Sequence, residues 1–206
     1  MIGAWKMGAA LAAGNTMVVK PPETASLSLL RLAGLAREAG LSDGVLNVVT
    51  GPGATTGAAL ALSMDVDVLT FTGSGATGRR LLEYAAQSNL KRVYLELGGK
   101  SPNIVFADAD NLEAAAKASA AGIFRNSGQV CVAGSRVLVE RNIADDFTKA
   151  LIEEAQALRV GNPLDLSTDI GAVHSEIQLA SNLAMVETAQ GDGADLLTGG
   201  DRVLAD

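Results

Sequence analysis

The sequence has few of the residues that form disulfides and metal centres. Its 206 residues include one cysteine, Cys131, and one histidine, His174. A single cysteine excludes an internal disulfide framework and a cysteine-rich metal centre, and a single histidine leaves too few imidazoles for a zinc site. We therefore expect no metal, and the cysteine usage favours a reducing compartment. His174 has no partner for a triad and is interpreted as a surface residue at the start of a helix.

Positive charge and long apolar runs are also scarce. Lysine and arginine number 16 against 23 aspartates and glutamates, for a net charge of -7. The basic footprint that nucleic acid requires is therefore not expected. Residues 7–14 are small and apolar, which suggests a signal peptide, but the run is short and continues directly into a strand pattern. No stretch approaches the roughly 20 apolar residues of a membrane span, so we expect a cytoplasmic protein.

The remaining composition is that of a globular protein, with 48% hydrophobic and 19% charged residues. At roughly 150 residues per domain, the length supports one large domain or pieces of two. Strands are predicted at 16–20, 45–50, 66–72, 92–97, 103–106, 136–140 and 196–198. Helices are predicted up to Gly14 and at 26–39, 54–62, 79–87, 110–124, 145–158 and 176–189. This alternation predicts an α/β fold, a parallel sheet with helices on both faces.

The pattern restarts after the glycine pair Gly98-Gly99, where we place a domain boundary. Residues 1–98 form one domain. Residues 99–206 begin a second α/β domain and stop without closing an element. Its first helix, from residue 110 or 111, takes Asp110 or Asn111 as its cap.

A glycine motif, Gly73-x-Gly75-x-x-Gly78, follows one predicted strand and precedes a helix. Glycines in such a turn let backbone N–H groups approach a pyrophosphate at the positive end of the helix. The alternative is a glycine-rich turn with no ligand. A dinucleotide fingerprint would place a ribose-binding carboxylate about 20 residues further on, where Glu96 lies.

Two further residues are candidates for chemistry. Cys131 lies in a polar loop between Gly128 and Gly134, where a ligand could reach the sulfur and backbone N–H groups could stabilise an oxyanion. Alternatively, it packs as a small hydrophobe. Glu96 lies in an apolar strand, which is costly for a carboxylate without a partner or a task. Alternatively, Glu96 faces solvent on an edge strand or forms an ion pair with Lys100.

Residues 95–102 (LELGGKSP) and 128–131 (GQVC) resemble the two signature motifs of the NAD(P)-dependent aldehyde dehydrogenase superfamily. The segments GNTMVVKPPET, GVLNVVTG, FTGSGATG and NPLDLSTDIGAV resemble it too, in the family's order and spacing. The resemblance covers all 206 residues and amounts to a little under half of a full family member. It implies a Rossmann-like NAD-binding domain at 1–98 and the first part of the catalytic domain at 99–206.

The resemblance implies an oxidoreductase that converts an aldehyde to a carboxylic acid. Cys131 resembles the nucleophile that forms a thiohemiacetal, which becomes a thioester once hydride has left for the nicotinamide. Glu96 resembles the general base that activates the hydrolytic water. Lys20 and Glu23 resemble the pair that holds the adenosine ribose, so Glu96 is not needed for that role.

The remaining cofactor contacts follow from the same resemblance. Gly73 and Ser74 resemble the pyrophosphate contacts, within a turn that also includes Gly75 and Gly78. The Leu97 backbone resembles a contact to the nicotinamide carboxamide. Gly75 departs from the family, which usually has threonine or a similar residue there. The expected cofactor is NAD, preferred over NADP because Glu23 would repel a 2′-phosphate.

Several parts of the family pattern have no counterpart in this chain. They are the oxyanion-hole asparagine, a second ribose-binding carboxylate and the oligomerisation ribbon. We therefore interpret the chain as an internal fragment that is inactive alone, and expect the full-length protein to be a homo-oligomer. The alternatives are a non-catalytic nucleotide-binding remnant and a CoA-acylating enzyme, although that branch generally lacks the glutamate. Residues 121–124 and 128–136 most resemble enzymes of amino- or γ-glutamylamino-aldehydes.

Overall fold

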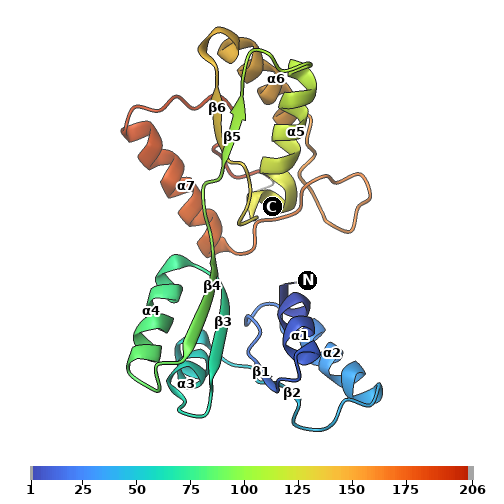
Figure 1. Cartoon of the computed structure of the whole chain (residues 1–206). Coiled ribbons are helices and arrows are strands. Elements are labelled where there is room, and N and C mark those ends of the chain that lie inside the picture. The colour runs from blue at the N-terminus through green and yellow to red at the C-terminus, as the bar shows by residue number, and fades with distance from the viewer. Residues whose placement is uncertain (1, 204–206) are drawn as a thin grey trace. The chain divides into compact units, whose positions relative to one another are not determined.

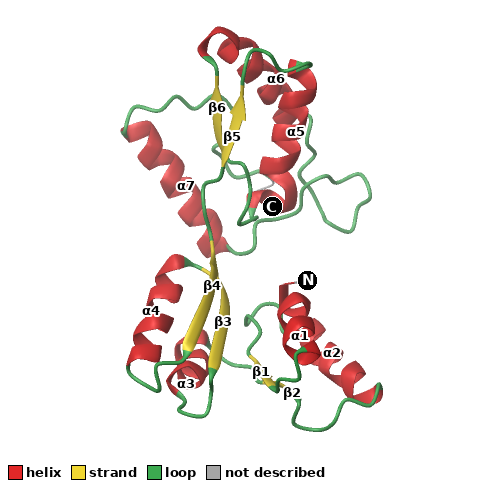
Figure 2. Cartoon of the chain, in the orientation of Figure 1, coloured by secondary structure: helices red, strands yellow, loops and turns green. Residues whose placement is uncertain are grey.

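The computed structural model describes residues 2–203. Helices and strands alternate along the chain (Figures 1 and 2). The chain divides into two compact units, Met1–Leu97 and Gly98–Asp206, where the prediction placed the division after residue 98. That these units are the NAD-binding and catalytic parts stays a prediction. None of the helices within residues 2–203 is both long and apolar enough to cross a membrane.

The first unit contains two pairs of parallel strands. Its elements are α1 (Ile2–Ala12), β1 (Met17–Val19), α2 (Leu27–Glu38), β2 (Leu46–Val48), a π-helical turn (Gly53–Gly57), α3 (Ala58–Leu62), β3 (Val68–Gly73), α4 (Gly75–Ala86) and β4 (Arg92–Leu97). β1 pairs with β2, and β3 pairs with β4. Because each pair is parallel, the loops after both of its strands leave from the same edge.

The helix α4 begins four residues earlier than predicted. Ser74 is its N-cap, and its side chain accepts a hydrogen bond from the N–H of Thr77. Serine is among the residues that best satisfy the free N–H groups at a helix start. The prediction of a helix from residue 79 was therefore wrong at its start, because it treated the glycines as a separate turn.

A buried lysine joins two helices of the first unit, α3 and α4. The ammonium of Lys91 donates to the carbonyl of Ala61 at 2.6 Å and to the hydroxyl of Ser88 at 2.8 Å. Ala61 lies in the last turn of α3, where the helix dipole favours a cation. The hydroxyl of Ser88 donates to the carbonyl of Tyr84 in α4. Lys91 thus links the ends of two helices to the start of β4.

The second unit is built on one parallel strand pair and two packed helices. Its elements are β5 (Pro102–Val105), α5 (Leu112–Phe124), a 3₁₀ segment (Arg125–Gly128), β6 (Arg136–Val139), a second 3₁₀ turn (Arg141–Ile143), α6 (Ala144–Gln156) and α7 (Glu176–Gly191). Phe147 is 1% exposed and packs with Val105 and Ala116. Asn111, one of the two candidates that the sequence offered, caps α5 by accepting from the N–H of Ala114.

Two expectations about the strands are corrected. Residues 196–198 form no strand. Leu196 and Leu197 are 46% and 61% exposed. The prediction was wrong because it relied on the apolar residues, whereas a strand also needs a neighbouring strand to pair with. The described strands of the first unit form two separate two-stranded parallel sheets, β1 with β2 and β3 with β4, rather than the single predicted sheet. The α/β class with parallel pairing is confirmed.

Exposed apolar side chains predict that the chain alone associates. Leu27 on α2 is 80% exposed, and Ile177 and Met185 on α7 are 85% and 65% exposed. Apolar faces of this kind and unpaired strand edges drive association. Light scattering should therefore detect dimers and larger species.

A matched pair of variants tests the cause of this association. Ile177→Lys should reduce it, whereas Leu166→Lys, at a fully exposed loop position, adds the same charge away from the helix faces and should not. A monodisperse monomer with a sharp unfolding transition would contradict the prediction.

Candidate functional site

The turn between β3 and α4 has the geometry of an anion site. It follows a parallel strand and leads into a helix of 12 residues. By helix geometry the N–H groups of Gly75 and Ala76 have no intrahelical acceptor, and the positive end of the helix dipole lies beside them. The Ser74 hydroxyl also donates to Thr77 Oγ1 at 3.0 Å. These groups suit a phosphate at the start of α4.

The three glycines of the motif are the last residue of β3 and two residues in the first turn of α4, and they have different steric roles. A Cβ at Gly73 would collide with the ring of Phe71, and one at Gly78 would lie 3.1 Å from a methyl carbon of Leu97. Gly78 is therefore needed for the close contact of α4 with β4. A Cβ at Gly75 would approach only the end of the Arg79 side chain, at 3.5 Å. No tight contact requires glycine at position 75, where the sequence departs from the family pattern.

A second cluster follows the first strand pair. Lys20, directly after β1, pairs with Glu23, the two charged groups lying 3.3 Å apart. The carboxylate of Glu23 also accepts a hydrogen bond from the N–H of Gly53 at 2.7 Å. Because β1 and β2 are parallel, the segments after them meet at one edge. Sequence reasoning identified Lys20 and Glu23 but missed Gly53, whose only signal is its place in the turn after β2.

Hydrogen bonding sets the charge state of Glu23. The pKa of Glu23 lies below its ordinary value because backbone N–H groups, its own and that of Gly53, donate to the carboxylate, with a further contribution from Lys20. A lowered pKa favours the ionised form, so the link to Lys20 and Gly53 persists above that pKa and is lost as the pH falls through it. An ionised carboxylate is a good acceptor for a pair of sugar hydroxyls.

Glu96 lies one residue before the end of β4 and is exposed. It stands opposite Thr72 of β3 in the parallel register, and no side chain of residues 2–97 forms an ion pair with it. Of the alternatives that the sequence left open, a glutamate that faces solvent is the one that holds for Glu96 within its unit. Lys100 donates to the carbonyl of its neighbour Gly99. A carboxylate in contact with water is placed to accept a proton from water.

Cys131 is exposed in a turn that precedes β6, so the alternative of a buried, packed cysteine is wrong for this chain. The parallel register pairs Pro102 with Arg136, which brings the residues before β5 and β6 to the same edge. The position of a Cβ on Gly99 would be 3.7 Å from the Cys131 carbonyl oxygen. Parts of the two sequence motifs therefore meet, although they lie about 30 residues apart.

The backbone before Cys131 is strained. Asn126 and Ser127 have φ of 54° and 57°, and Gly128 follows with φ of 73°. A left-handed conformation costs an L-residue other than glycine roughly 1–2 kcal/mol, so two consecutive residues of this kind need support. The side chains of Ser127 and Gln129 provide it through bonds to residues 171–174.

The structure groups the predicted residues into three sites. Lys20 and Glu23 lie together, residues 73–78 join the end of β3 to the first turn of α4, with Gly78 next to Leu97, and Cys131 belongs to the second unit. Within residues 2–203, no three histidine, cysteine, aspartate or glutamate side chains gather as a metal site would require.

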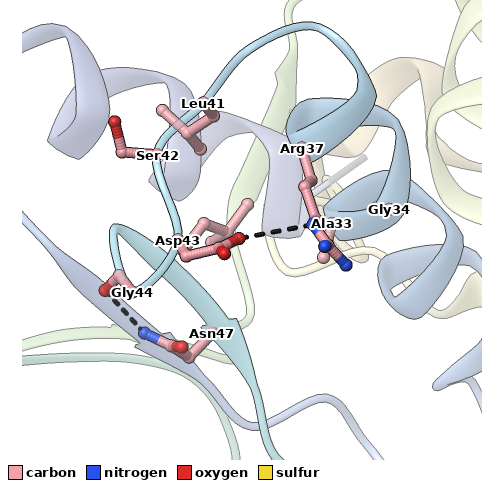
Figure 3. A pocket seen from close by; sticks show the side chains of 9 residues that line it. Ala33, Gly34, Arg37, Leu41, Ser42, Asp43, Gly44 and Asn47 are labelled. Atoms are coloured by element: carbon pink, nitrogen blue, oxygen red, sulfur yellow. Dashed lines mark hydrogen bonds and ion pairs between the residues drawn. The ribbon is translucent and has the colours of Figure 1, made fainter.

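A surface depression of about 490 Å³ lies elsewhere (Figure 3). It is lined by the end of α2 and the segment leading into β2, including the ion pair of Arg37 with Asp43 at 3.3 Å. In open α/β sheets ligands bind beyond the carboxyl ends of the strands, whereas this depression lies where β2 begins. It contains none of the predicted site residues.

Known proteins of one family resemble this chain along its whole length. All 206 residues match the sequence profile described as the aldehyde dehydrogenase family. The NADP/NAD-dependent aldehyde dehydrogenase PuuC of Escherichia coli K12 is 51% identical over 205 residues, which are 100% of this chain and 41% of PuuC.

Two solved structures share the fold. A γ-glutamyl-γ-aminobutyraldehyde dehydrogenase from Burkholderia cenocepacia J2315 has a TM-score of 0.95 and 52% identity. An indole-3-acetaldehyde dehydrogenase in complex with NAD+ has a TM-score of 0.96 and 50% identity. Each match covers 99% of this chain and 41% of the other. The chain thus spans well under half of the length of these relatives.

The exposure of Cys131 predicts fast chemical labelling. Because it is the only cysteine, the mass of the intact chain reports on this site alone. Iodoacetamide should add one adduct, at a native rate within about threefold of the rate in denaturant, since an exposed thiol is not protected by packing. Mass spectrometry over time measures this, with Cys131→Ser as the unreactive control. Strong protection in the native chain would show that the thiol is packed inside.

Proposed function

This chain belongs to the aldehyde dehydrogenase family, and we propose that a complete enzyme containing it oxidises an aldehyde to a carboxylic acid with NAD. The observation that carries the proposal is the placement of Cys131. It is the only thiol, it is exposed, and it stands in a constrained loop whose backbone approaches Gly99 of the LELGGKSP motif. A nucleophile needs this combination of access and fixed position.

Two clusters of the first unit would hold NAD. The start of α4, with Gly73, Ser74 and Gly75, suits the pyrophosphate, and the Lys20–Glu23 pair suits the adenosine ribose. The Leu97 backbone would contact the nicotinamide carboxamide, and Gly78 keeps α4 against its strand. When bound, NAD accepts the hydride that leaves the substrate carbon. A solved relative with 50% identity is described in complex with NAD+.

The residues of this chain divide the chemistry between them. The Cys131 sulfur attacks the aldehyde carbon, and the resulting thiohemiacetal becomes a thioester when its hydride departs. Glu96 then takes a proton from a water molecule, whose oxygen attacks the thioester carbon. The C–S bond breaks, the acid leaves as the carboxylate and Cys131 is restored. The exposure of Glu96 supports this role because a hydrolytic base must contact water.

The proposed substrates are amino- or γ-glutamylamino-aldehydes. The support is the sequence of residues 121–124 and 128–136 and the name of the Burkholderia relative. Indole-3-acetaldehyde is a second candidate, because a relative of 50% identity is named for it. A cytoplasmic location and a homo-oligomeric state stay predictions.

Glu96 and Cys131 are separated by pre-steady-state kinetics of the complete enzyme. Glu96→Gln should leave a burst of about one NADH per site, because acylation does not need the base, while steady-state turnover falls about 100-fold or more. Cys131→Ala should abolish both burst and turnover and keep NAD binding. Equal loss of burst and turnover in Glu96→Gln would exclude the water-activating role. Turnover that depends on added CoA would favour the CoA-acylating alternative. NAD binding without any turnover would favour the non-catalytic nucleotide-binding remnant.

The choice of cofactor depends on Glu23. A 2′-phosphate would place like charge beside a carboxylate that the Gly53 N–H holds in place. We expect kcat/KM to be about tenfold higher with NAD than with NADP. A ratio of this size corresponds to the repulsion between two like charges that water and salt screen. Glu23→Gln can still accept from Gly53 but loses the charge, so it should narrow the gap, chiefly by improving NADP.

The control is Glu83→Gln, which removes an exposed charge on α4 and should leave the ratio unchanged. Equal use of both cofactors by the unmutated enzyme, or a ratio that Glu23→Gln does not move, would refute the role of Glu23.

A further inference from the structure

The loop that carries Cys131 is attached to a distant segment of the second unit. The hydroxyl of Ser127 donates to the carbonyl of Gly171 at 2.8 Å, across 44 residues of sequence. The side-chain oxygen of Gln129 accepts from the N–H of His174 at 3.1 Å, across 45 residues. Two of the four residues before Cys131 are therefore tied to residues 171–174.

The segment that shares these bonds with the loop is itself fixed at both ends. Ile170 forms a β-bridge with Val160, and its carbonyl accepts from the N–H of Gly161 at 3.0 Å. Arg159 adds a salt bridge to Asp169 at 3.1 Å. After residue 174 the chain enters α7, whose cap is Ser175. Residues 171–174 can therefore serve as a fixed support for the loop.

The attachment falls where the backbone needs it. Ser127 is half-buried and has φ of 57°, a conformation that serine rarely adopts. Within the loop, Asn126 and Gln129 exchange bonds between their side chains and each other's carbonyl groups. Those bonds shape the turn but do not attach it to the rest of the unit. Ser127 and Gln129 alone among the loop's side chains make such an attachment within residues 98–203.

We propose that Ser127 is a positioning residue for the Cys131 thiol, with Gln129 as a second anchor. The proposal rests on the proposed function, in which Cys131 is the nucleophile. The Ser127–Gly171 bond holds the left-handed turn in one conformation, and the turn sets where the sulfur stands four residues later. A nucleophile displaced by about 1 Å can lose about 100-fold in rate. The bond therefore governs the rate of acylation rather than the binding of cofactor.

Substitutions at Ser127 separate the bond from the strain. Ser127→Ala removes the hydroxyl and keeps the strained conformation. Ser127→Gly also removes the hydroxyl, but glycine adopts a positive φ without strain, so this variant preserves the fold. Ser127→Asn restores a donor on a residue that tolerates the left-handed region. Ser135→Ala is the control, because Ser135 is exposed close to Cys131 and its hydroxyl makes no bond within residues 2–203.

The measurements are the NADH burst rate and the NAD dissociation constant of the complete enzyme. Ser127→Ala and Ser127→Gly should both slow the burst about tenfold or more with NAD binding unchanged. Ser127→Asn should recover most of the rate, and Ser135→Ala should keep all of it. A normal burst rate in Ser127→Gly would overturn the proposal, because that variant also lacks the hydroxyl. Any loss in Ser127→Ala would then come from its strained backbone and not from the missing hydrogen bond. A burst in Ser127→Asn as slow as in Ser127→Gly would also overturn it.

Failure of the proposed function has a separate signature. If Cys131→Ala kept its burst, the nucleophile would be misassigned whatever Ser127 does. If Cys131→Ala lost the burst while Ser127→Gly kept it, the positioning role alone would fail.

Discussion

The chemistry of this chain depends on the parallel pairing of its strands. Parallel register sends the segments after two strands to one edge and the segments before them to the other. In the first unit this brings Glu23, after β1, to the N–H of Gly53, after β2. In the second unit it brings Gly99, before β5, to Cys131, before β6. The same constraint thus builds the cluster of Lys20, Glu23 and Gly53 from strand ends and the approach of Gly99 to Cys131 from strand beginnings.

Close packing around the glycine turn shows which glycines this arrangement requires. Gly78 brings α4 within contact of Leu95 and Leu97, and Gly73 leaves room for the ring of Phe71. Gly75 has no such neighbour. Two of the three glycines in the motif are therefore required by close neighbours, whereas the space around Gly75 is open.

The thiol loop follows a different principle, in which polar bonds hold a conformation that the residues do not prefer. Strained backbone at functional sites persists only where the surrounding structure determines it. Here the determinants lie more than 40 residues away in sequence, in a segment held by a β-bridge and a helix cap. The first unit also has a long-range polar contact, at Lys91, whose buried ammonium donates to the end of α3 and to Ser88.

The sequence by itself determined the alternation of strands and helices and the bounds of β4, and it narrowed the cap of α5 to Asp110 or Asn111, because these depend on side-chain preferences within a few residues. It also identified the family, since the motifs around Glu96 and Cys131 are contiguous. Only the tertiary structure decided that Gly53 holds Glu23, that Ser127 is tied to Gly171, and that residues 196–198 lack a partner strand. Each of these depends on groups 30 or more residues apart or on a neighbour that must be present in space. A local sequence pattern does not show which distant residues meet, and these contacts exist only in the folded chain.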